Sequence, residues 1–202
     1  MRRLSPQRGS VSVLSLVLVL MLLLGLAFAA DLAGAMAIRS SQANQVAIAR
    51  DSTMSGAFLM QAKNADDPGA AVAKRAAESL RENGWDGEIE VWFAEAPASD
   101  LPAGKRAWAW GMSISEESPT WFAGAFSALD GVEVGDGACA RAVPYTAGTA
   151  WRPPGPAVQR RYHFAAGTSA EPDAVSDAAL RDMPQGVQDQ MAAALEEARS
   201  AQ

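Results

Sequence analysis

The side chains best suited to acid–base or nucleophilic chemistry are few in this sequence. His163 is the only histidine, and it lies within a strand-like stretch from Arg160 to Phe164. A catalytic triad needs a base held beside a nucleophile, and the sequence has no Gly-x-Ser-x-Gly motif to supply one. We therefore predict a structural or solvent-exposed His163 and no catalytic residue.

Acidic side chains suggest two other chemistries. Glu88 and Glu90 share one face of a predicted strand, and paired carboxylates can serve glycoside hydrolysis. Residues 130 to 137 (DGVEVGDG) alternate acids with glycines, but they lack the ligand spacing and the distal Glu of a compact calcium site. We interpret the first pair as a solvated strand face and the second stretch as a turn and strand edge, and we predict no metal and no cofactor.

Cysteine chemistry is limited because Cys139 stands alone. An intrachain disulfide and a Cys-x-x-Cys or Cys/His zinc site are excluded. We interpret Cys139 as a small buried thiol.

Tryptophans are numerous for so short a chain, and aromatic surfaces bind sugars, proteins or membrane interfaces. Four of them fall in elements with a predicted buried face, and we assign these mainly to the core: Trp92, Trp108, Trp110 and Trp121. Trp151 and Arg152 instead lie in a proline-rich stretch that cannot form regular structure. We predict this pair as a candidate for surface recognition.

The charge distribution is uneven along the chain. The formal net charge is −6, yet Arg2, Arg3 and Arg8 are the only charged residues among the first thirty. Without these three arginines, the rest of the chain has 14 basic and 23 acidic residues, which gives it a formal net charge of −9. Phosphate backbones would repel such a body, so we predict no nucleic-acid partner.

The three arginines precede a long apolar run. From Val11 to Ala30 there are twenty residues without a charge, and a helix of that length spans the ~30 Å hydrocarbon layer of a bilayer. The positive-inside rule places a basic leader, residues 1–10, in the cytoplasm and the chain after the 11–30 membrane helix on the other side. We therefore predict a single-pass protein of the cytoplasmic membrane with an extracytoplasmic body.

A secretory signal peptide is the alternative for the same residues. The small-x-small triplet from Ala27 to Ala29 fits signal peptidase. However, no proline occurs between Pro6 and Pro68, and the helical pattern continues past Ala30. We favour a retained anchor and leave cleavage after Ala29 as the alternative.

Beyond the bilayer the helix is predicted to continue through residues 31–66. Apolar residues recur at helical spacing, and one unbroken helix from Val11 to about Ala62 would measure ~75 Å. Small residues recur at every fourth position of this helix: Gly25, Ala29, Ala33 and Ala37. Such a stripe would let another helix approach closely.

Several short motifs accompany this helix: Arg8 to Leu14, the leucine-rich run, Asp31-Leu32, Arg39 and Ser41-Gln42-Ala43-Asn44. Together, over roughly residues 8 to 60, they resemble the N-terminal motif of the TadE/TadG-like pseudopilins of bacterial Tad (tight adherence, Flp pilus) systems. The resemblance implies a pilin-like component of a pilus assembly, with possible prepilin peptidase cleavage between Gly9 and Ser10. Pilin-like proteins generally carry Glu where Leu14 stands here, whereas TadG-like members commonly have an apolar residue at this position. The resemblance therefore favours the TadG-like branch and leaves open whether the leader is cleaved.

The exported body, residues 67–165, alternates short elements and is predicted as an α+β domain packed against the long helix. The expected elements are a helix over 70–83 stopped by Gly84, strands over 87–95 and 105–115, a helix from Pro119 to Leu129, a third strand from Val132 or over 138–145, and an edge strand over 160–164. Residues 166–202 are predicted as a linker over 167–173 and two weak helices, 174–182 and 187–201. Met191 and Leu195 give the last helix a thin apolar stripe, which predicts loose docking or a partner contact.

These observations predict a structural, non-enzymatic component of a Tad pilus or secretion assembly. Its partners would be the lipid bilayer and other transmembrane or pilin-like helices. The alternative is a membrane-tethered or secreted binding module with no pilus role. An exported hydrolase would need an acid pair in a pocket with perturbed pKa values, which the sequence does not identify.

Overall fold

The computed structural model describes residues 10–95, 108–119, 131–142 and 158–177, together with residues 185, 188, 189, 192, 193 and 196 of the C-terminal tail. The chain divides into two compact units: Met1–Ile38 with Glu117–Val134, and Arg39–Glu116 with Gly135–Gln202. The second unit, here called the head unit, contains the short helices and most of the sheet. The domain boundaries expected from the sequence stay a prediction.

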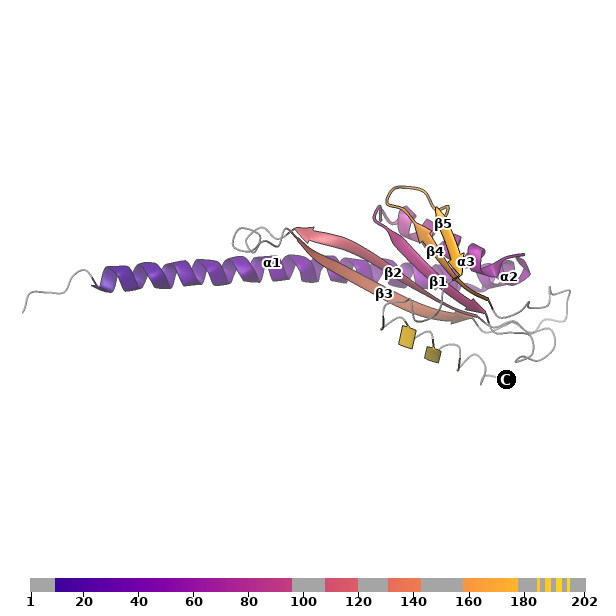
Figure 1. Ribbon diagram of the computed structural model, residues 1–202, viewed down its shortest axis with the longest axis horizontal. Helices are drawn as coiled ribbons and strands as arrows, with labels where there is room; N and C mark the ends of the chain where they lie inside the picture. Colours follow the sequence, from indigo (N-terminus) through magenta and orange to yellow (C-terminus); the bar gives the residue numbers. More distant parts are fainter. Residues whose placement is uncertain are drawn as a thin grey trace, which may run out of the picture. The chain divides into compact units, whose positions relative to one another are not determined.

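The N-terminal helix α1 runs from Ser10 to Thr53 (Figure 1). A second helix, α2, follows over Gly56–Asn64, so the prediction of one unbroken helix to Ala62 was wrong. Hydroxyl groups explain the break: Thr53 Oγ1 donates to the Arg50 carbonyl at 2.8 Å, and Ser55 Oγ accepts from the Phe58 amide at 3.4 Å. Ser and Thr side chains that bond nearby backbone groups compete with a continuing helix and favour a new N-cap.

Helix α3 spans Pro68–Glu82 and confirms the helix predicted over 70–83. Asp67 caps its start by accepting from the Ala70 amide at 3.0 Å, and Pro68 follows at the first helical position. Gly84 ends the helix at φ +85°, while the Trp85 amide donates to the Leu80 carbonyl at 3.0 Å. This is a Schellman end, and it confirms Gly84 as the predicted stop.

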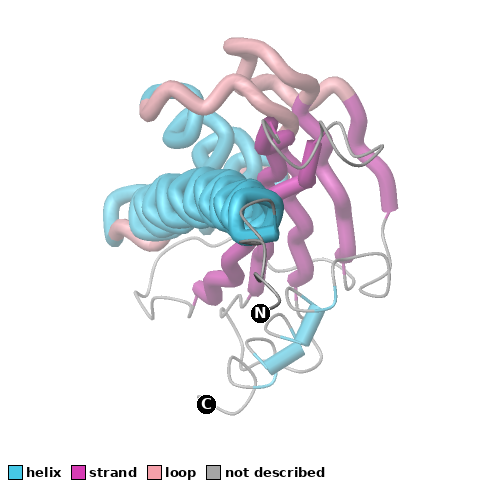
Figure 2. The backbone as a smooth tube through the Cα atoms, turned by 90° about the vertical axis from the view of Figure 1, so that its left-hand side faces the viewer, coloured by secondary structure: helices cyan, strands magenta, loops and turns pink. Residues whose placement is uncertain are grey.

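The sheet contains five strands in the order β3-β2-β1-β4-β5, and Figure 2 shows the strands side by side. Their bounds are β1 Ile89–Glu95, β2 Trp108–Pro119, β3 Gly131–Ala142, β4 Val158–Phe164 and β5 Ala174–Asp177. Strand β1 pairs with β2 and with β4, β4 also pairs with β5, and these three pairings are antiparallel. A long apolar N-terminal helix and a small antiparallel sheet with short helices confirm the α+β class.

Three strand and helix predictions need correction. The stretch 160–164 is not an edge strand, because β4 lies between β1 and β5. The helix predicted from Ala174 was wrong, since Ala174–Asp177 is strand β5; backbone pairing with β4 outweighs the local helical preference. Pro119 does not open a helix but ends β2. The rest of that predicted helix, 120–129, lies outside the described residues.

The core forms between one face of the sheet and the helices of the head unit. Ile89, Val91 and Phe93 point to this core face, as the alternation predicted, and none is more than 1% exposed. Across the core, α3 contributes five buried residues: Val72, Ala73, Ala76, Ala77 and Leu80. From β2 and β4 the core takes Trp108, Trp110, Met112, Ile114, Tyr162 and Phe164. Trp92, on the other face of β1, is also buried, at 1% exposed.

Close contact between α3 and the sheet depends on Gly69. A Cβ atom placed there would lie 2.5 Å from Tyr162 Oη and 2.9 Å from Phe93 Cδ1. Real Cβ atoms do not approach other atoms so closely, so α3 could not keep its place with a larger residue at this position.

Gly69→Ala is therefore expected to destabilise the head by about 1 to 3 kcal/mol, because it overpacks a filled core. Gly56→Ala is the matched control, since a Cβ there meets nothing within 4 Å. Denaturant unfolding of the detergent-solubilised chain measures both. Equal stability of the two variants would contradict the close-contact account.

Candidate functional site

The beginning of α1 is the largest exposed apolar surface among the described residues. From Val13 to Phe28 its large apolar side chains are between 47% and 70% exposed, apart from Leu24, which is half-buried. Within the described part of the chain, one helix, Val13–Thr53, is long and apolar enough to cross a membrane. A signal sequence near the N-terminus would meet the same criterion, so the alternative of cleavage stays a prediction.

The small-residue stripe lies on this exposed helix. Gly25, Ala29, Ala33 and Ala37 are all solvent-exposed, and a Cβ on Gly25 would meet no heavy atom within 4 Å. The backbone is therefore accessible along the stripe, which is the condition for close helix–helix contact.

Other predicted site residues fall outside the described part. This holds for Arg2, Arg3 and Arg8, for Gly9, and for the pair Trp151 and Arg152. Ser10, on the far side of the predicted cleavage point, is the first residue of α1.

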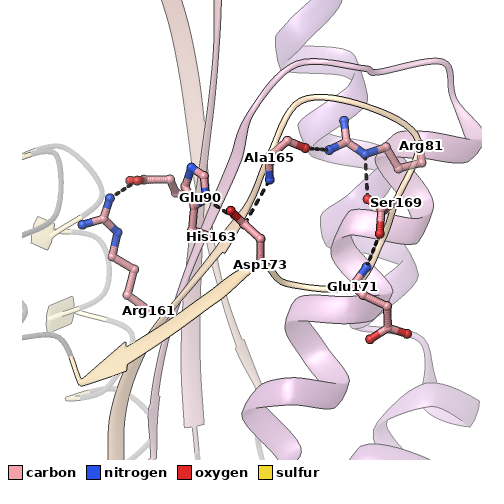
Figure 3. Close-up of polar contacts among 8 residues, drawn as sticks. All are labelled: Arg81, Glu90, Arg161, His163, Ala165, Ser169, Glu171 and Asp173. Atoms are coloured by element: carbon pink, nitrogen blue, oxygen red, sulfur yellow. Dashed lines mark hydrogen bonds and ion pairs between the residues drawn. The ribbon is translucent and has the colours of Figure 1, made fainter.

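In the head unit, Arg81 joins three segments through its guanidinium group (Figure 3). Nε donates to the Ser169 carbonyl at 3.1 Å, and Nη2 donates to the Ala165 carbonyl at 2.8 Å. Nη1 donates to the carbonyls of Trp85 and Gly87, at 3.0 and 2.7 Å. Burial lowers the pKa of Arg81, and the charge of Asp86 opposes this shift. Arg81 thus ties the end of α3 to the start of β1 and to the β4–β5 connection.

The connection from Ala165 to Asp173 has its own polar contacts. His163 Nδ1 lies 2.8 Å from Asp173 Oδ1, and the same oxygen accepts from the Ala165 amide at 3.1 Å. The hydrogen bond from His163 lowers the pKa of Asp173. Lys74 forms an ion pair with Glu171. The predicted linker is therefore a loop fastened to the head, and His163 serves this structural contact.

The remaining candidates for chemistry have structural surroundings. Glu90 forms an ion pair with Arg161 across the strands, and Glu88 is exposed, which fits a charged face. Trp92, Trp108 and Trp110 are buried, as predicted, while Trp121 lies outside the described residues. Residues 131–137 belong to β3. No group of three or more metal-ligating side chains occurs in the parts that the structure describes.

Asp67 organises a second polar cluster at the start of α3. One of its carboxylate oxygens caps the helix and accepts from Tyr162 Oη at 3.4 Å, and the other pairs with Arg160. Burial, and then the nearby charge of Asp67, raises the pKa of Tyr162 to about 12. Neither the role of Asp67 nor that of Arg81 was predicted from the sequence. The Asp-Pro dipeptide was a usable signal for the cap, whereas no local pattern marks Arg81.

The chain was compared with protein-family models, curated proteins and solved structures, and it matches none of them. The described residues comprise a helix with an exposed apolar surface and a head whose polar clusters join separate segments of the chain.

Arg81→Met is expected to destabilise the head by about 2 to 3 kcal/mol, because it leaves carbonyl groups of two segments, the turn before β1 and the β4–β5 connection, without a charged donor. Arg75→Met is the matched control on the same helix, since Arg75 makes one partly exposed ion pair with Glu78 at 3.8 Å. That change should cost about 0.5 kcal/mol or less. Chemical denaturation measures both, and a similar loss from the two variants would refute the joining role of Arg81.

Tyr162 predicts an alkaline loss of stability. Its folded pKa of about 12 lies above the ordinary value of 10.0, so its contribution is complete below pH 10 and is lost as the pH rises through about 12. Denaturant unfolding across this range should show the loss in the wild type and a smaller one in Tyr162→Phe. An alkaline loss in Tyr162→Phe as large as that of the wild type would contradict the assignment.

Proposed function

We propose that this chain is a structural, non-enzymatic component of a bacterial Tad pilus or secretion assembly, similar to the TadE/TadG-like pseudopilins. The observation that carries the proposal is the exposed apolar surface of α1. Leaving such side chains in water costs about 1.5 to 3 kcal/mol each, so lipid or partner helices must cover them. The motifs from Arg8 to Asn44 support the choice of family.

In this proposal α1 is the membrane anchor of a single-pass protein of the cytoplasmic membrane. The arginines of the leader hold the N-terminus in the cytoplasm, and the head lies on the extracytoplasmic side. The stripe from Gly25 to Ala37 is the contact for other pilin-like helices. The polar clusters around Arg81 and Asp67 stabilise the head in this arrangement, because each one joins separate segments of it.

The rival function is a tethered or secreted binding module. Neighbouring genes for a secretion ATPase and integral assembly proteins would favour the pilus role, and an isolated gene would favour the binding module. The intact mass of the mature protein distinguishes a retained start from cleavage after Gly9 or Ala29.

Affinity purification from membranes in mild detergent tests the proposal directly. We expect pilus-assembly proteins to be recovered with the wild type and to be largely lost with Ala33→Leu, because the larger side chain keeps a partner helix away. Ala35→Leu is the matched control, since residue 35 lies on nearly the opposite side of the helix. Recovery of the wild-type chain alone would overturn the proposed function, and equal effects of the two variants would overturn the role of the stripe.

A further inference from the structure

Strand β5 lies at one end of the sheet. In the order of the described strands it follows β4 and has no further neighbour (Figure 1). All four of its residues are exposed, and Val175 is 54% exposed. The backbone N–H and C=O groups on the free side of an edge strand are a template for pairing with another strand. We call this free side of residues 174–177 the β5 edge.

The residues just before β5 are fixed to the head (Figure 3). The Asp173 amide donates to the His163 carbonyl at 3.0 Å, and Asp173 Oδ1 accepts from the Ala165 amide at 3.1 Å. Arg81 holds the same connection at the carbonyls of Ala165 and Ser169. The β5 edge is therefore held in place before any partner binds, which lowers the entropy that binding costs.

The side chains of β5 on the core side of the sheet favour an apolar neighbour. Val175 and Asp177 lie on the same side of the strand, because alternate residues share a face. The register partner of Val175 is Tyr162, which belongs to the core and is only 1% exposed. The apolar layer of the head thus ends at Val175 with an uncovered side chain. An apolar residue on an added strand can pack beside it.

The β5 edge carries negative charge. The segment from Ala165 to Asp177 contains no Lys, Arg or His and three acids: Glu171, Asp173 and Asp177. The first two have partners within the head. Asp177 is exposed and has no ion pair among the described residues, since its register partner Arg160 pairs with Asp67. A basic side chain opposite Asp177 would complement this charge.

We propose that the β5 edge binds an extended segment of a partner protein, which adds to the sheet as a further strand. The segment carries an apolar residue beside Val175 and a Lys or Arg residue beside Asp177. Main-chain hydrogen bonds hold such a strand, and its alternate side chains give specificity. A second copy of β5 fits poorly, because antiparallel pairing centred on Val175 sets Asp173 of one copy against Asp177 of the other. This inference does not depend on the pilus role.

A synthetic peptide tests the proposal in the full-length, detergent-solubilised protein. Fluorescein-labelled Thr-Lys-Thr-Val-Thr-Lys-Thr has apolar and basic residues at alternate positions, and the control peptide has Glu in place of Lys. Fluorescence anisotropy should show the Lys peptide binding at least about tenfold more tightly, because the cross-strand charge pairs reverse their sign. Bound Lys peptide should also slow amide hydrogen exchange in residues 174–177 by about tenfold or more, since new strand pairing protects the backbone.

Three results would overturn the proposal. They are equal binding of the two peptides, binding without slower exchange in β5, and no binding of the Lys peptide at about 1 mM. Slow exchange in residues 174–177 of the peptide-free protein that is lost on dilution would overturn it too, because a second copy would then occupy the edge.

Two variants separate the β5 edge from the general negative charge of the protein. Asp177→Asn should weaken binding of the Lys peptide by about threefold, the usual size of one cross-strand charge pair. Asp51→Asn, which removes an exposed acid on α1, is the matched control and should leave binding unchanged. Equal effects of the two variants would refute the contact at Asp177.

Discussion

The head unit depends on the seating of α3 across β1 and β4. Gly69 permits the approach, because any side chain there would collide with Tyr162 and Phe93. Polar contacts then hold both ends of the helix: Asp67 pairs with Arg160 at the start, and Arg81 bonds the backbone of the β4–β5 connection at the end. With one cysteine in the chain, no intrachain disulfide can form, and the head relies on noncovalent contacts of this kind.

Much of this arrangement was predictable where the signal is local. The apolar run, the glycine stop after α3 and the alternation of Ile89, Val91 and Phe93 each report on a few neighbouring residues, and each matched the structure. The break between α1 and α2 at Ser55 was not predicted, because the apolar periodicity of the sequence continues through it. The hydroxyl contacts that cause the break produce no periodic pattern in the sequence.

Long-range pairing explains the other misses. The stretch Ala174–Asp177 is too short and too polar to be predicted as a strand from its sequence. It forms one because β4 offers an edge with which it can pair. The role of Arg81 could not be predicted for the same reason, since its carbonyl partners at Ala165 and Ser169 lie more than eighty positions away in the sequence.

The strand order has a consequence for the time course of folding. Strand β1 lies between β2, its sequence neighbour, and β4, whose Arg161 is 71 positions beyond Glu90. Closing so large a loop costs entropy before any contact repays it, and chains dominated by distant contacts fold slowly. The β1–β2 hairpin therefore emerges during synthesis with one edge of β1 unpaired, and that edge stays open to wrong partners until β4 has been made.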